Sequence, residues 1–233
     1  MITVPGGHVT LSDRRTERTW TVEVAAYRLA AYPLTQAAYA QITGTHPGSP
    51  LDGQDSGQLP AHSLSWWDAI RYCNTLSRQE GLTPAYHLPR TTDTEDGEDR
   101  ADGEEAGVTW DRDADGYRLP TEAEWEHACR AGTTGPRYGP LDDIAWHRGN
   151  SQERIHEVGG RRPNPWGLYD MLGNVWEWCW DLYDPAVYGT YRVLRGGGWF
   201  DEHWSCRASV RRRSHPTLQI EDVGLRLART LRP

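Results

Sequence analysis

The chain has 233 residues, 37% of them apolar, and a formal net charge of −8 at pH 7. This length suits one domain with a buried core, and we expect residues 1–233 to form a single domain. All 25 basic residues are arginine. The lack of lysine excludes Schiff-base chemistry, pyridoxal phosphate attachment and a Walker-type phosphate-binding loop.

The composition favours an α+β fold with many turns. There are 24 glycines, 15 prolines and 12 tryptophans against a single phenylalanine, so the core should depend on tryptophan and tyrosine. The four cysteines stand far apart, which argues against a disulfide-scaffolded secreted domain.

Most of the negative charge lies in one segment. Residues 91–107 hold eight acidic residues and one arginine, a local charge of −7, and we expect a solvated, mobile insertion there. No stretch approaches about twenty consecutive apolar residues, and the first residues lack a signal-peptide pattern. We therefore expect a cytoplasmic protein without membrane contact. A secreted one stays open if a signal peptide has been removed.

Paired strands and three helices are expected in chain order. Short β-prone runs over residues 2–31 predict paired strands. Helices are expected from Thr35 to Gly44, from Ser65 to Gly81 and from Thr121 to Gly132, each with a capping residue at its start. Residues 108–119 predict a strand, a turn and a strand. Further strands are expected near residues 191–194, 206–211 and 223–228.

The segment 164–180 is unlike ordinary amphipathic structure. It places four tryptophans and two glycines among acidic and amide groups, with neither a helical stripe nor a strand alternation. We expect an irregular, buried segment held by polar atoms, with a cation as one candidate partner.

Four long motifs carry a family resemblance in the right order. They are YRLPTEAEWEHACRAG (117–132), NPWGLYDMLGNVWEWCWD (164–181), RVLRGGGW (192–199) and CRASVRRR to VGLRLAR (206–229). Together they resemble the formylglycine-generating enzymes, the sulfatase-modifying factor superfamily. The resemblance implies a C-type-lectin-like fold with little regular secondary structure and a pocket built by the segment after RGGGW. Relatives include copper oxidases, iron-dependent sulfoxide synthases and ligand-binding proteins, so the fold alone does not fix the activity.

The oxidases of this superfamily bind copper through two cysteines just after the GGS[WY] turn. Here the first of these positions holds Asp201, and Cys206 is the only thiol in the segment. A bis-thiolate copper site therefore cannot form, and formylglycine generation by the usual chemistry is not expected.

An iron or copper oxidase or oxygenase acting on an amino acid or peptide side chain remains the alternative. Asp201, His203 and His215 are candidates for a non-heme iron triad, and Cys206 is a further catalytic candidate. The other interpretation is a polar pocket rim without metal.

Calcium is the cofactor that the resemblance favours. The family's ligands map onto the side chains of Asp170 and Glu177 and the carbonyls of Gly173 and Val175. A second family site would begin at Asn150, but its downstream aspartate has no counterpart.

The favoured hypothesis is a calcium-stabilised recognition module for a peptide, protein or small-molecule ligand, of the kind found among retroelement-diversified variable proteins. We expect a monomer that does not bind nucleic acid, since no basic groove motif is present. The expected ligand-binding residues are Trp199, Phe200, Asp201, Glu202, His203, Trp204, Arg207 and Arg211.

Overall fold

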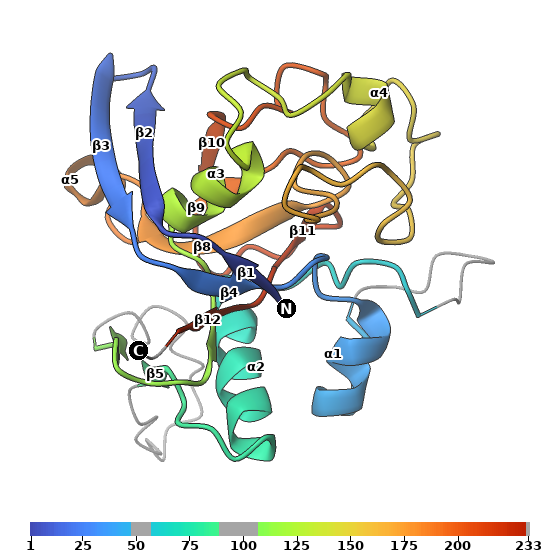
Figure 1. Cartoon of the computed structure of the whole chain (residues 1–233). Helices are drawn as coiled ribbons and strands as arrows, with labels where there is room; N and C mark the ends of the chain where they lie inside the picture. Colours follow the sequence, from blue (N-terminus) through green and yellow to red (C-terminus); the bar gives the residue numbers. More distant parts are fainter. Residues whose placement is uncertain (48–56, 89–106, 232–233) are drawn as a thin grey trace.

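The computed structural model describes residues 1–47, 57–88 and 107–231 (Figure 1). The expected acidic insertion lies almost wholly outside these residues, so its behaviour stays a prediction. Among the described residues, no helix combines the length and the apolar character needed to cross a bilayer.

Strands from both ends of the chain form the first sheet. Its antiparallel order is β1 (Ile2–Val4), β4 (Tyr27–Leu29), β12 (Ala228–Thr230) and β7 (Tyr117–Arg118). Strand β12 therefore joins the C-terminal segment to the N-terminal one. Strands β2 (Gly7–Asp13) and β3 (Arg18–Val24) pair along their whole length as a hairpin that extends away from this sheet (Figure 1).

The three expected helices are present with the expected N-caps. They are α1 (Gln36–Thr43), α2 (Trp66–Gln79) and α3 (Glu122–Arg130). Ser65 with Asp68, and Thr121 with Glu124, form reciprocal capping boxes that satisfy free amides of the first turns. The third helix differs at its end, because Ala131 takes the left-handed cap position one residue before Gly132. Two single-turn helices are α4 (Leu141–Ile144) and α5 (Pro185–Tyr188).

The second sheet lies at the centre of the molecule. Its order is β10 (Arg211–Ser214), β9 (Arg192–Arg195), β8 (Trp176–Leu182) and β11 (Val223–Gly224). Strand β11 runs parallel to β8, while the other pairs are antiparallel. A short pair is formed by β5 (Tyr86–His87) and β6 (Thr109–Trp110).

The segment 164–180 corrects one prediction. Its first part is irregular, as expected, but its second part is the central strand β8. Trp176 and Trp178 pack into one hydrophobic cluster, and Cys179 packs into the other. Because both faces of the strand are buried, the sequence shows no alternation of polar and apolar residues.

One further strand prediction needs correction. Residues 206–210 are irregular, and strand β10 begins only at Arg211. Strands β6 and β7 flank the expected turn, but β6 pairs with β5 and β7 pairs with β12. The expected strand, turn and strand over residues 108–119 are therefore present, and each strand pairs with a partner outside this segment.

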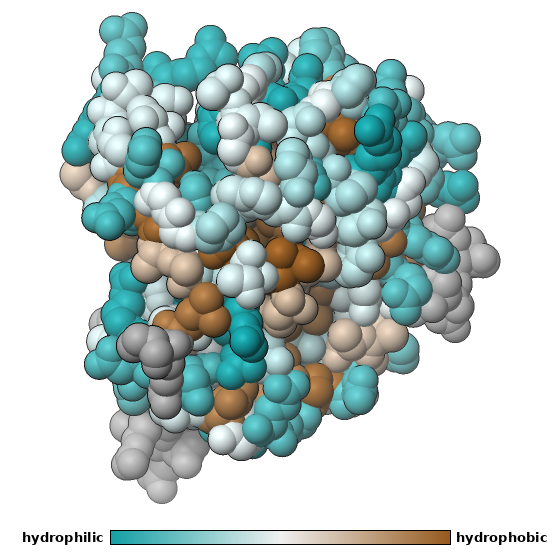
Figure 2. Space-filling model, in the orientation of Figure 1, coloured by the Kyte–Doolittle hydropathy of each residue, from teal (hydrophilic) through white to brown (hydrophobic). Residues whose placement is uncertain are grey.

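Tryptophan dominates the core, as the composition predicts. Trp66, Trp125, Trp176 and Trp178 are almost completely buried. Their indole nitrogens find acceptors at distant points of the chain, such as Trp178 Nε1 to the Leu64 carbonyl at 2.8 Å. On the face drawn in Figure 2, hydrophilic side chains cover most of the surface and hydrophobic ones gather in small groups near the middle.

Candidate functional site

The loop after the Gly196–Gly198 turn is fixed at its base by Asp201. The Oδ2 atom of Asp201 accepts hydrogen bonds from Trp176 Nε1 at 2.6 Å and from the Gly198 amide at 2.9 Å. Gly197 has φ +84°, and a Cβ atom there would lie 2.9 Å from the Cys206 Sγ atom. Only glycine suits this turn, which packs directly against the buried cysteine.

Two aromatic side chains of this loop face solvent. Phe200 is 51% exposed and Trp204 is 54% exposed. The backbone around them is held, because Arg137 donates to the carbonyls of His203 and Cys206. A fixed loop that exposes two large aromatic rings is typical of a binding surface.

The remaining loop residues divide between the rim and the core. Glu202 pairs with Arg148 at 3.3 Å, and the exposed His203 ring lies edge-on to Trp204. Trp199 is only partly exposed and packs against the small cluster of Leu59, Ile155 and Val175. We therefore place Trp199 at the edge of the core, and its expected contact with a ligand stays a prediction.

A pocket of about 360 Å³ lies beside Trp204, and we call it the loop pocket. It joins the ligand loop to the tip of the β2–β3 hairpin, almost two hundred residues earlier in the chain. The residues that line it include Ser12, Arg14, Arg15, Trp204, Ser205, Arg207 and Ser209. The sequence signalled the contribution of Trp204 and Arg207, but no local pattern indicated the residues of the hairpin tip.

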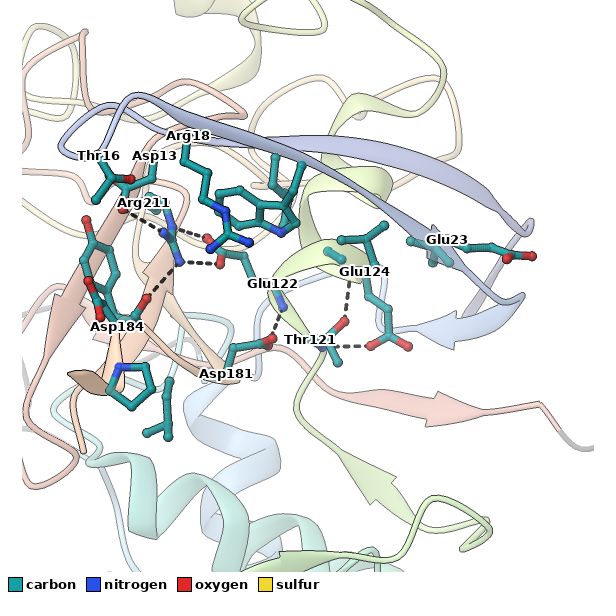
Figure 3. Close-up of a pocket in the computed structure, with 18 of the residues that line it drawn as sticks. Asp13, Thr16, Arg18, Glu23, Thr121, Glu122, Glu124, Asp181, Asp184 and Arg211 are labelled. Atoms are coloured by element: carbon teal, nitrogen blue, oxygen red, sulfur yellow. Dashed lines mark hydrogen bonds and ion pairs between the residues drawn. The ribbon is translucent and has the colours of Figure 1, made fainter. Parts of the chain in front are cut away.

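Arg211 is part of a buried charge network. Its guanidinium group binds both carboxylate oxygens of Glu122 at 2.7 Å and contacts Asp13 (Figure 3). Glu122 also accepts a bond from the fully buried Arg195, whose second partner is Glu126. Arg211 lines the loop pocket, as a ligand residue would, but carboxylates of the fold already occupy its donors, so its expected ligand role stays a prediction.

The non-heme iron triad is not assembled. The described residues, which include Asp201, His203 and His215, contain no group of three histidine, cysteine or acidic side chains placed to hold a metal. The Asp201 carboxylate serves the loop base, and His215 contacts Thr217 and Tyr191. The described structure therefore does not bring these three residues together, and a catalytic role for any of them stays a prediction.

Cys206 is also unsuited to catalysis. Its side chain is completely buried, and burial raises the pKa of the thiol to about 12. A thiol of this kind stays protonated at neutral pH and is a poor nucleophile or metal ligand. The other three cysteines are free and buried as well, which fits a structural role.

Asp170 has one feature that fits a cation. Its side chain is buried, its Oδ2 atom accepts from the Gly159 amide at 2.6 Å, and its Oδ1 atom has no hydrogen-bond partner among the described residues. Gly173 and Val175 follow on the same buried segment. A buried oxygen without a donor is a candidate ligand for a hard cation.

Glu177 does not fit the same site. Both of its oxygens accept from Arg226, at 2.7 to 3.1 Å, and Oε2 also accepts from Trp125 Nε1 at 2.7 Å. The charge of this carboxylate is balanced by an arginine, which corrects its expected role as a calcium ligand. The side chain of Asn150, where the second calcium site would begin, is also engaged in hydrogen bonds within the fold. Its Oδ1 atom accepts from the His147 amide, and its Nδ2 atom donates to the Ala145 carbonyl.

This mixed fold, with few helices, many short strands and a ligand loop after a glycine-rich turn, is of the formylglycine-generating-enzyme type with C-type-lectin-like architecture. The chain matches the family described as "Sulfatase-modifying factor enzyme 1-like domain" over residues 1–231, and it belongs to that family. The fold class and the family resemblance are thereby confirmed.

Solved structures and curated relatives agree with this assignment. Treponema denticola variable protein 1 superposes with a TM-score of 0.88 at 31% identity, covering 99% of this chain and 95% of that chain. The structure of CarF gives a TM-score of 0.76 at 25% identity, covering 99% and 98% of the two chains. Chaperone protein LppX of Paenibacillus barcinonensis is 30% identical over 90% of this chain and 82% of that protein.

This chain covers a smaller part of the relatives that are named as enzymes. Formylglycine-generating enzyme of Streptomyces coelicolor is 34% identical, over 48% of this chain and 46% of the relative. Hercynine oxygenase of Mycolicibacterium smegmatis is 29% identical over 97% of this chain, but this chain spans only 60% of that enzyme.

Proposed function

We propose that the chain is a recognition module whose binding surface consists of Phe200, Trp204 and the loop pocket. The observation that carries this proposal is the pair of half-exposed aromatic rings on a loop whose base and carbonyls are hydrogen-bonded. Aromatic side chains on a fixed backbone lose little entropy on binding and bury a large area.

The loop pocket supplies the polar part of this surface. Arg14 and Arg207 line it, and neither has a carboxylate partner within the described parts of the chain. Three serine hydroxyls lie around them. A ligand with an apolar portion for the rings and hydrogen-bond acceptors for the pocket would match both parts.

We also propose that the loop belongs to the class of surfaces that vary between members of the variable-protein group. The likeness to Treponema denticola variable protein 1 over almost the whole chain supports this. Phe200, His203 and Trp204 can change without disturbing the core, whereas Cys206 is buried in it and Asp201 anchors the base of the loop. Sequencing this gene in related isolates tests the point, since substitutions should concentrate at the exposed loop positions.

Calcium remains part of the proposal in a reduced form. Asp170, with the carbonyls of Gly173 and Val175, would hold the ion and stiffen the irregular part of segment 164–175, while Glu177 stays with Arg226. We further propose that residues 1–233 form one domain, because β12 pairs with β4 and β7 from distant parts of the chain.

The binding surface can be tested with peptides selected from a random display library against the wild-type protein. The double variant Phe200→Ala, Trp204→Ala should bind the selected peptides roughly thirtyfold more weakly, as expected for aromatic hot spots. Tyr32→Ala removes another exposed ring and is the matched control. Selected peptides that bind the double variant as tightly as the wild type would contradict the proposal.

A further inference from the structure

A second cavity, of about 680 Å³, lies between the β2–β3 hairpin and the body of the protein, and we call it the hairpin groove. Its walls are the two hairpin strands, the first turn of α3, and the end of β8 with the residues that follow it (Figure 3). The volume lies in the usual range for sites that bind small molecules or single side chains. The family resemblance gives this groove no role.

The groove is lined by more acidic than basic side chains. Six carboxylates line it, against the three arginines Arg18, Arg112 and Arg211. Four of the carboxylates have arginine partners: Asp13 and Glu122 bind Arg211, Asp184 binds Arg15, and Glu124 binds Arg118. Among the described residues, Asp181 and Glu23 have no such partner.

Asp181 lies in the more enclosed of these two positions. It is half-buried, and its Oδ2 atom accepts a 2.7 Å hydrogen bond from the Glu122 amide at the start of α3. Burial and the neighbouring Glu122 carboxylate raise the pKa of Asp181 to about 6. The amide of the helix terminus therefore does not fully compensate the charge, and a positive group beside Asp181 would.

The aromatic side chains of the groove are also suited to cations. Trp20 lines the groove, and the guanidinium groups of Arg18 and Arg211 each lie 5.4 Å from its ring centroid. The ring of Tyr183 has Arg211 at 4.4 Å and Arg213 at 5.3 Å from its centroid. These contacts show that cations stack on both rings in this structure. Arg18 is exposed and points into the groove in Figure 3, so it would compete with a bound cation.

We propose that the hairpin groove binds an organic cation, an alkylammonium or guanidinium group, with Asp181 as the counter-ion and Trp20 and Tyr183 as the side walls. The cation belongs either to a free amine or to a lysine or arginine side chain of a polypeptide. Both sources present the same chemistry to Asp181. The groove shares Asp13, Tyr183 and Arg211 with the lining of the loop pocket, whereas the exposed rings of Phe200 and Trp204 do not line it.

The test is calorimetric titration of the full chain with four probes. Butylamine and butylguanidine represent free cations, and end-blocked Gly-Lys-Gly and Gly-Arg-Gly represent side chains of a polypeptide. Binding by at least one pair is expected, and the preferred pair identifies the source. Asp181→Asn, which retains an acceptor for the Glu122 amide, should weaken binding about tenfold, whereas the rim control Glu23→Gln should change it less than about twofold.

Two results would overturn the proposal: no binding of any probe to the wild type, or equal binding to the wild type and the Asp181→Asn variant. Arg18→Ala provides a second arm that leaves Asp181 in place. Because it removes the competing guanidinium group, it should tighten binding about threefold. Unchanged or weaker binding by this variant would contradict the assigned place of the cation.

Discussion

The Arg226 guanidinium group and the Glu177 carboxylate form a bidentate ion pair that is shielded from solvent on all sides. The remaining donors of Arg226 reach the carbonyls of Ala30 and Tyr169, so the pair connects β8, the segment before α1 and the irregular segment 164–175. The position that the resemblance gave to a calcium ligand is thus a point where three distant parts of the chain meet.

Replacing Glu177 by Gln should lower the free energy of unfolding by about 3–5 kcal/mol, because the charge of Arg226 would stay buried without a counter-ion. Urea denaturation followed by tryptophan fluorescence measures the change. The control is Arg148→Gln, which breaks the exposed pair with Glu202 and should cost less than about 1 kcal/mol. An equal decrease in the free energy of unfolding in the two variants would show that the buried ion pair stabilises the protein no more than the exposed one.

Asp170 tests the calcium proposal. Asp170 has φ +51°, a conformation that asparagine tolerates, so Asp170→Asn keeps the backbone while removing the charge. In millimolar calcium the melting temperature of the wild type should rise relative to a chelator, since a ligand that binds only the folded state stabilises it. The variant should show no such rise.

One outcome would contradict calcium binding through Asp170. If calcium changes the melting temperature of neither protein, or of both by the same amount, the ion is not bound through this carboxylate.

Asp181 should make the stability depend on pH. Burial, Glu122 and Glu124 raise its folded-state pKa from 3.8 to about 6, so the folded protein holds this proton more tightly than the unfolded chain does. The resulting cost is small at pH 4, grows as the pH rises to about 6 and is complete at pH 7. Asp181→Asn should therefore stabilise the protein by about 1–3 kcal/mol at pH 7 and by much less at pH 4.

Paired denaturation curves at the two pH values measure this difference for Asp181. A variant that is less stable than the wild type at pH 7 would mean that the carboxylate is compensated in the folded state.

Asp201 should control the order of the ligand loop. Asp201→Ala leaves the Trp176 indole N–H and the Gly198 amide without their acceptor, at a cost of about 1–3 kcal/mol each. We expect faster hydrogen exchange at residues 198–204 in the variant. Glu202→Ala, in the same loop but with only an exposed partner, should leave the exchange rates nearly unchanged. Equal hydrogen-exchange rates in the wild type and both variants would show that Asp201 does not hold the loop in place.

Local chemistry made the helices predictable. Thr35, Ser65 and Thr121 each act as N-caps, and a cap is decided by residues within one turn of each other. The fold class followed from four long motifs, which carry far more information than the short strands do. Strand pairing was less accessible, because β7 and β12 meet from positions more than a hundred residues apart.

The site was predictable only in part. The exposed positions of Phe200 and Trp204 agree with the resemblance, and Arg207 lines the loop pocket. Arg211 looked equally available in the sequence, yet Glu122 takes its donors through a contact between residues 89 positions apart. The hairpin tip could not be assigned either, since Arg14 and Arg15 carry no motif and reach the pocket only through tertiary structure.

We propose that the loop after Trp199 recognises a ligand and lacks the copper chemistry of the oxidases. This proposal is tested most directly by incubating the protein with a cysteine-containing sulfatase peptide, copper and air, followed by mass spectrometry of the peptide. The account predicts that the cysteine is recovered unchanged, because Asp201 is fixed by Trp176 and the only thiol of the loop, Cys206, is buried. Conversion of the cysteine to formylglycine, at a rate above that of copper and air alone, would contradict it.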